Sequence, residues 1–564
     1  MKPRSVVNNK QRWQAFWQTP LALANGYNFL LNNRQMKKTI ITLATFFLMG
    51  AVSAQHEGHQ HGHTKEPKKK AAVSQKGQKS AKQDSMVHKS ALPLTDTIKP
   101  NKGKPVNQQH DHSMHDHGRT ADTIKPGTGS HLPSAAHNLS AGDHHRSGSE
   151  DHATHQMSHS FSRNLPMNRN GSGTGWLPDN APMYGYMYHS RRWMYMLHGN
   201  LFLRYNKQDL LDKGTRGDAK FDVPSWLMFM GQRPVGSKGL FRFSTMVSLD
   251  PVIAGGEGYP LLFQTGESWK DQPLIDRQHP HDLISELSVG YTHALSPKAD
   301  VFVYLGYPGE PALGPVAFMH RPAALNNPDA PLTHHWVDAT HITFGVATLG
   351  VRYNNFKLEG SRFTGREPGE NRYNFDKPRF DSWSGRLSYN PTPKWALQVS
   401  HAFIKEPETL HPGEDVNRTT ASATFSSRGF GYEFVNLTAL WGMNKTAHHN
   451  AEHGVLLEGS YVRRKLGLFG RYEWVQKSVE ELGLSEQVFG HHAIFPVHAF
   501  TAGVNYDLFS IGQTRVAAGT QFTFYNPDEK LSPLYGQNPV AGQIYLRIYP
   551  SALGKKAGAF FLPY

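Results

Sequence analysis

The sequence predicts an all-β fold: a transmembrane antiparallel β-barrel of about 16 strands, preceded by a disordered histidine-rich segment. Three observations lead to this prediction. From residue 193 onward, apolar and polar side chains alternate along successive segments, with turn residues between them. The connections between these segments alternate between short and long. A tract poor in large apolar side chains and rich in Lys, Ser, Gly and His comes before them.

The first element is a signal peptide over residues 36–54. Met36-Lys37-Lys38 opens a basic start, residues 40–49 form an apolar run, and small residues lead to Ala54. This order is typical of a secretory signal that is cleaved after its small residues, and the apolar run is too short to span a bilayer comfortably. Residues 1–35 hold no comparable feature, so we interpret them as an over-extended start. An uncleaved anchor helix is the alternative.

The composition of the whole chain restricts its chemistry. Its 564 residues include no cysteine, which excludes disulfides and thiolate metal sites. The formal net charge is +15. Much of that charge lies in segments predicted to be disordered, so we interpret it as a solvated basic tail and expect no nucleic-acid partner.

Residues 55–175 are expected to be a disordered periplasmic segment, because they cannot bury enough apolar surface to offset chain entropy. The segment holds 16 of the chain's 33 histidines. Imidazoles beside carboxylates or a thioether are suitable ligands for copper, zinc or nickel. A polar spacer whose histidines merely titrate is the alternative. The candidate ligands in the densest cluster are His110, His112, Met114, His115 and His117.

The barrel is assigned to residues 176–564. Period-two alternation places one face of a strand in lipid and the other in the lumen, as in Ile544, Leu546 and Ile548 against Gln543, Tyr545 and Arg547. Strands are expected to begin near residues 193, 225, 239, 283, 300, 341, 355, 381, 394, 419, 431, 453, 466, 496, 513 and 540. Alternating connection lengths are typical of outer-membrane barrels, with short periplasmic turns and long external loops.

Histidines of the barrel half gather in the long connections, and none lies in a short turn. Imidazoles and carboxylates from neighbouring loops can converge on a divalent ion, and loops that fold inward would place that site in the lumen. The set His279, His281 and Asp282 is the first choice, because three ligands fall within four positions. The other candidates are His320, His334, His335, His448 and His449. Ordinary surface histidines are the alternative.

Several motifs resemble an uncharacterised family of bacterial outer-membrane β-barrel proteins over about residues 170–550. They are the segments 176–184, 193–199, 258–267 and 276–282, and Gly309-Glu310-Pro311-Ala312 with Met319-His320-Arg321-Pro322. The resemblance implies the barrel and carries over no catalytic residue. In layout the chain also resembles the copper-resistance B proteins, which place a Met/His-rich periplasmic segment ahead of a barrel. Here histidines far outnumber methionines in that segment, which favours zinc or nickel over copper.

These features predict an outer-membrane protein, not an enzyme, that binds or exports a transition metal. No cofactor is required, although copper, zinc or nickel is a possible bound ion. Expected partners are outer-membrane lipid, the metal ion, periplasmic metal-handling proteins and the barrel-assembly machinery. A general porin or structural barrel without metal specificity is the alternative. An outer-membrane lipid hydrolase is a lesser one, which needs a serine or aspartate beside a histidine at the lipid-facing rim.

Overall fold

The computed structural model describes residues 161–430, 432–447 and 449–553. They belong to one compact unit, residues 140–564. The expected signal peptide, the residues before it and the candidate ligands His110, His112, Met114, His115 and His117 lie outside the described residues, as does His448. Within the described ranges, no helix has the length and apolar character needed to cross a membrane.

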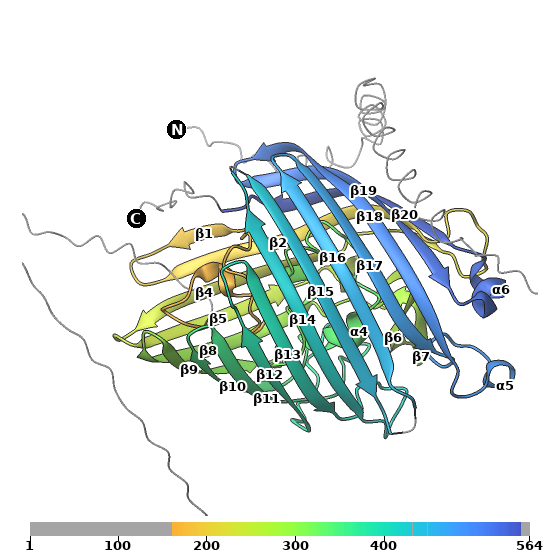
Figure 1. Ribbon diagram of the computed structural model, residues 1–564, viewed down its shortest axis with the longest axis horizontal. Helices are drawn as coiled ribbons and strands as arrows, with labels where there is room; N and C mark the ends of the chain where they lie inside the picture. Colours follow the sequence, from red (N-terminus) through yellow and green to blue (C-terminus); the bar gives the residue numbers. More distant parts are fainter. Residues whose placement is uncertain (1–160, 431, 448, 554–564) are drawn as a thin grey trace, which may run out of the picture. The chain divides into compact units, whose positions relative to one another are not determined.

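Sixteen antiparallel strands form a closed barrel (Figure 1). Strands that are adjacent in the chain pair with each other around the wall, and β20 pairs with β2 to close it. The barrel strands are β2 (Met194–Lys207), β4 (Ser225–Val235), β5 (Gly239–Val247), β8 (Ile284–Ser296), β9 (Ala299–Gly306), β10 (Val346–Tyr353), β11 (Phe356–Phe363), β12 (Ser382–Tyr389), β13 (Trp395–Ile404), β14 (Val416–Arg428), β15 (Glu433–Lys445), β16 (Glu452–Arg463), β17 (Leu466–Ser478), β18 (Ile494–Ile511), β19 (Thr514–Pro527) and β20 (Val540–Pro550).

Smaller elements decorate this wall. Strand β1 (Tyr186–His189) pairs with the first half of β2, and β3 (Ala219–Asp222) pairs with its second half. Strands β6 (Tyr259–Trp269) and β7 (Gln272–Gln278) form a separate hairpin within the second long connection. The helical turns are η3 (Met167–Arg169), α3 (Asp250–Ile253), η4 (Phe318–His320), α4 (His334–Val337), η5 (Ala339–His341), α5 (Glu486–Phe489), η6 (Glu529–Leu531) and α6 (Ser532–Tyr535).

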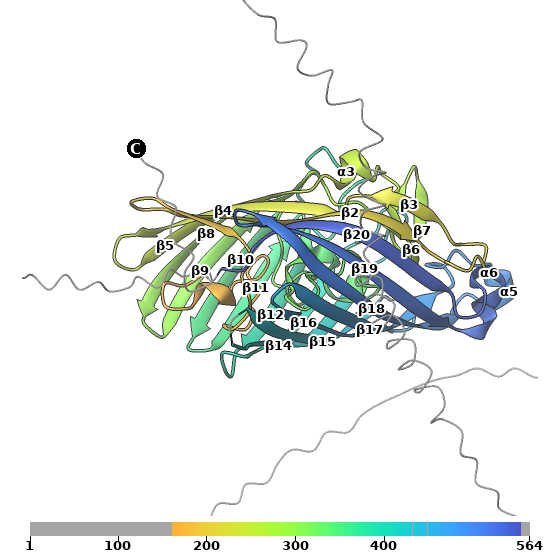
Figure 2. The same cartoon turned by 90° about the horizontal axis from the view of Figure 1, so that it is seen from above.

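The expected strand number and alternating connection lengths are confirmed. Figures 1 and 2 both show β6, β7, α5 and α6 gathered at one end of the barrel, which we call the long-loop end. The opposite end, with the tight turns, is the short-turn end. The largest error concerns the sixth strand, which was expected near residue 341 and begins at Val346. The residues before it form η5 and the end of a buried loop.

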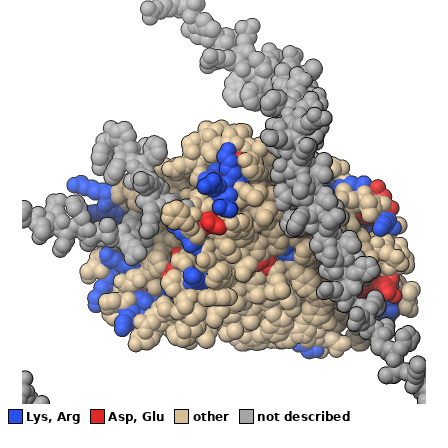
Figure 3. Space-filling model, turned by 45° about the horizontal axis from the view of Figure 1, so that its top comes forward, with Lys and Arg blue, Asp and Glu red and all other residues tan. Residues whose placement is uncertain are grey.

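The two faces of the wall differ as the alternation predicts. Outward side chains such as Leu349, Leu358 and Ile544 are exposed and apolar. Inward ones such as Arg386 and Arg471 are buried and polar. Figure 3 shows a broad area with few charged side chains in the lower half of the view, while Lys and Arg lie toward the left end, in the upper middle and, beside Asp and Glu, at the right. An apolar outer surface around a polar lumen is the pattern of a barrel that sits in lipid, and the protein is an outer-membrane β-barrel.

The lumen is filled by the chain itself. The connection between β9 and β10 turns inward, so that every residue from 308 to 345 except His320 and Leu325 is buried. Residues 161–175 also pack inside, which corrects the expectation that disorder extends to residue 175. Phe161 is buried under the Arg242 guanidinium, 3.7 Å from its ring centroid, and the Arg386 guanidinium donates to Thr174 Oγ1. Polar lumenal side chains therefore hold a segment whose own composition does not predict a fold.

Candidate metal centre

The inward loops bring five histidines together. His279 and His281 follow β7, His334 and His335 open α4, and His341 ends η5. The ring centroids of His334 lie 5.8 Å from His279, 5.2 Å from His335 and 5.2 Å from His341. His281 joins the group 5.4 Å from His341. We call these five residues the lumenal histidine cluster.

A short helix sets the position of the central pair. The turn α4 contacts the inner faces of β14, β15 and β16, where Gly442 and Gly454 leave room for Trp336. Trp336 is almost fully buried there, so its neighbours in the turn are held against the wall. His334 and His335 therefore face His279, which arrives from the hairpin of the preceding long connection.

Acceptors orient several imidazoles through Nδ1. His334 Nδ1 lies 2.7 Å from Asp338 Oδ1, and His281 Nδ1 lies 2.8 Å from Asp250 Oδ2. His341 Nδ1 lies 2.8 Å from the Asp338 backbone carbonyl. His279 Nδ1 approaches Glu267 Oε1 at 3.0 Å without hydrogen-bond geometry, and His335 Nδ1 lies 3.7 Å from Glu367 Oε1. A carboxylate or carbonyl on Nδ1 places the remaining proton there and leaves Nε2 with a free lone pair.

The Nε2 atoms of all five imidazoles are buried and have no hydrogen-bond partner in the protein. Leaving several polar nitrogens unpaired at one place is costly, so such a group calls for an explanation. For His279, His334 and His335, one ligand atom from each lies within 4.8 Å of the others. Three neutral imidazoles with oriented rings are the donor set that zinc, nickel or copper takes.

Burial keeps these imidazoles neutral. It lowers the pKa of His334 to about 4, against the partial opposition of Asp338. Burial likewise lowers the pKa values of His279, His335 and His341. A metal ion binds the neutral form of imidazole. At neutral pH these four residues can therefore bind an ion without first losing a proton.

One carboxylate anchors the cluster to the barrel wall. Asp338 Oδ2 accepts from Arg321 Nη1 at 2.7 Å and from the Phe318 backbone N–H at 2.9 Å. Arg321 is fully buried and also donates through Nε to Glu458 Oε1 at 2.6 Å on β16. Burial alone would raise the pKa of Asp338, but His334 and Arg321 together hold it well below its usual value. Asp338 is therefore a permanent anion that connects the His334 ring to the wall.

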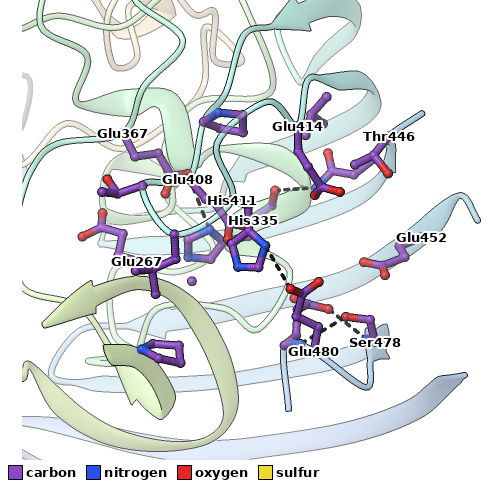
Figure 4. Close-up of a pocket in the computed structure, with 18 of the residues that line it drawn as sticks. Glu267, His335, Glu367, Glu408, His411, Glu414, Thr446, Glu452, Ser478 and Glu480 are labelled. Carbon is purple, nitrogen blue, oxygen red and sulfur yellow. Dashed lines mark hydrogen bonds and ion pairs between the residues drawn. The ribbon is translucent and has the colours of Figure 1, made fainter. Parts of the chain in front are cut away.

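An acidic vestibule leads from the long-loop end to this cluster. A cavity of about 150 Å³ reaches from His335 to the loop residues Glu414, His449 and Glu480. Its lining includes eight glutamates, one arginine and no lysine. Figure 4 shows His335 and His411 among these glutamate side chains. Burial raises the pKa of Glu367, and that of Glu408 to about 8, so part of this lining is neutral near pH 7. The lining still holds more carboxylates than its one arginine can balance, and a cleft lined mainly by one sign of charge concentrates counter-ions.

The structure groups only part of the sequence-predicted set. His279, His281, His334 and His335 come together, and His341 joins them. Asp282 is directed elsewhere: its Oδ2 lies 3.5 Å from Arg372 Nη1, so the expected contiguous set with His279 and His281 does not form. His320 lies apart, beside His198 and Trp226. His449 forms a second, more exposed group with His491 and His492 at the long-loop end.

Comparisons with known proteins concern the fold. No family model matches the chain, and no curated protein matches it either. Among solved structures, the Salmonella typhi OmpF complex with daunomycin is 10% identical, with a TM-score of 0.40, over 64% of this chain and 100% of that one. An anion-selective porin from Comamonas acidovorans is 10% identical, with a TM-score of 0.38, over 64% of this chain and 99% of that one.

A third similar structure is a loop-deletion mutant of OmpT, an outer membrane protein of Vibrio cholerae. It is 10% identical, with a TM-score of 0.37, over 63% of this chain and 99% of that one. At such identity the likeness concerns the fold alone. The layout of the copper-resistance B proteins and the absence of enzyme activity stay predictions.

Proposed function

We propose that this outer-membrane barrel binds a transition-metal ion at the lumenal histidine cluster and passes it between the two ends of the lumen. The observation that carries the proposal is the set of five buried, unpartnered Nε2 atoms. Their Nδ1 atoms face acceptors of the kind that orient metal-bound imidazoles. The acidic vestibule supports the proposal independently, because it places a cation-attracting cavity directly against His335.

The test uses the purified full chain, loaded with zinc and then washed with a chelator. A buried site exchanges its ion slowly, whereas exposed histidines release theirs quickly. We expect about one zinc per chain to remain after a brief wash, as measured by elemental mass spectrometry. The double variant His279→Gln/His334→Gln should retain none. The matched control His401→Gln changes an exposed histidine on the outer face of β13 and should retain the ion. Equal retention in the double variant, or none in the unaltered chain, would end the proposal.

A porin without metal specificity is the second candidate, and its support is the barrel fold itself. The two candidates differ in what planar-bilayer conductance should do. A general pore should conduct equally before and after addition of zinc or copper. Conductance through a lumen that contains the proposed site should change on metal addition, and His279→Gln/His334→Gln should abolish that change. The lipid-hydrolase alternative gains no support from the two His–Asp pairs of the cluster, because the side chains of His281–Asp250 and His334–Asp338 are buried and do not face lipid.

A further inference from the structure

Methionines gather in the part of the lumen nearer the short-turn end. Of the ten methionines within residues 161–553, seven belong to one hydrophobic cluster. They are Met183, Met187, Met196, Met228, Met230, Met246 and Met319. Methionine is a useful filler of irregular cores, so a cluster alone shows only packing. What distinguishes this one is the cavity and the two imidazoles beside it.

Strand register produces the cluster. Met196 on β2 stands directly opposite Met230 on β4, and Met228 stands opposite Met246 on β5. All four side chains are buried on the inward face. Directly opposed residues have Cβ atoms about 5 Å apart, so the paired thioethers lie within reach of one small ion.

Two histidines complete the group. His198 lies two positions after Met196 on β2, and its ring centroid is 5.8 Å from that of His320. The Nε2 atom of His198 is buried without a hydrogen-bond partner. His320 packs against Trp226 with centroids 4.5 Å apart. A cavity of about 70 Å³ is lined by Met196, Met230 and both histidines, which is room enough for an ion. Its one charged lining residue, Arg547, donates its guanidinium hydrogen bonds to Asn200 Oδ1 and Asn326 Oδ1.

We propose that Met196, Met230, His198 and His320 form a second metal site, which takes a soft monovalent cation of the Cu(I) or Ag(I) class. Thioether sulfur is a soft donor that prefers such ions, whereas carboxylate-rich sites prefer hard ones. The site is distinct from the lumenal histidine cluster. Its place on a route for ions rests on the proposed function, but its capacity to bind does not.

A single helical turn connects the two sites. His320 ends η4, and Phe318 begins it. The Phe318 ring lies 5.4 Å from that of His334 and 6.3 Å from that of His281. The thioether site, the histidine cluster and the acidic vestibule therefore follow one another from the short-turn end to the long-loop end.

The test is Ag(I) binding to the purified full chain, measured by calorimetry and by X-ray absorption at the silver edge. The absence of cysteine removes the usual competing thiols. The variant Met196→Leu/Met230→Leu keeps nearly the same volume and apolar character, so packing survives. We expect it to lose one silver equivalent and the silver–sulfur scattering of that site. The matched control Met443→Leu, on β15 and outside the cluster, should lose neither.

The histidine-rich tract contributes the same silver background to every variant, so only differences count. Unchanged silver stoichiometry and scattering in Met196→Leu/Met230→Leu would overturn the thioether site. Chelator-resistant zinc, measured on the same preparations, reports separately on the histidine cluster. Loss of silver without any retained zinc in the unaltered chain would leave the thioether site standing and refute the proposed function.

Discussion

Replacing Asp338 by asparagine tests whether the carboxylate that orients His334 matters to metal binding. Three donors surround its two oxygens: the Nδ1–H of His334 at one, and Arg321 Nη1 and the Phe318 N–H at the other. An asparagine side chain has a single acceptor oxygen, and its amide group is itself a donor. In Asp338→Asn the side-chain NH2 group must therefore face a donor, so that either the His334 imidazole or Arg321 loses its acceptor.

The expected size of the effect follows from that loss. Mutation of an outer-shell partner of a metal-bound histidine typically costs 10- to 100-fold in affinity, or about 1.4–2.7 kcal/mol. We therefore expect Asp338→Asn to weaken zinc binding at the chelator-resistant site by about that factor. Competition against a chromophoric chelator on the purified full chain measures it.

The control is Asp329→Asn, the same substitution at another buried carboxylate of the inward loop, which pairs with Arg204 and not with a histidine of the cluster. It should leave the zinc affinity within about twofold, since it orients no ring of the cluster. An unchanged affinity in Asp338→Asn would refute the orienting role. An equal loss in both variants would trace the effect to general loosening of the inward loops.

Three further predictions concern the inward loop and the vestibule. Burial raises the pKa of Glu310 from 4.5 to about 8. Between these two pH values the folded chain holds a proton that the unfolded chain has released, so the free energy of unfolding falls as the pH rises from 4.5 to about 8. Glu310→Gln should therefore resist urea better than the unaltered chain at pH 9 and equally at pH 4, by tryptophan fluorescence. Gly314 has a φ of +76°, and a Cβ there would lie 2.0 Å from the Val337 carbonyl oxygen. Gly314→Ala should loosen the loop and raise bilayer conductance, whereas Gly255→Ala, with a similar φ and open space, should not. Glu414→Gln/Glu480→Gln should slow zinc loading several-fold at low salt and little at high salt; equal slowing at both would argue against electrostatic attraction.

The strands of the barrel wall could be predicted well from the local sequence. Side-chain direction alternates with a period of two in any strand. Because one face of the wall meets lipid and the other a polar lumen, apolar and polar residues alternate in the sequence of each strand. Tight turns and long connections likewise differ in length along the sequence. The strands beginning at Ser225, Gly239, Leu466 and Val540 start at the expected residues. The sixth did not, because residues before Val346 follow the packing of an inward loop, which has no such period.

The candidate site could be predicted only as a set of residue types. The sequence indicated His279, His281, His334 and His335, but it grouped Asp282 with the first two because of proximity in the chain. Adjacent residues at the end of a strand point in different directions, so three ligands in four positions need not share one ion.

Tertiary structure decided the rest. Inward folding of residues 307–345 brought His334 against His279, and the wall residue Glu458 positioned Arg321 and through it Asp338. Strand register alone placed Met196 opposite Met230. Such pairings depend on which segments the closed barrel brings together across long separations in sequence. Local patterns determined what each side chain offers chemically, whereas the closure of the sheet and the path of the inward loops determined which of them meet.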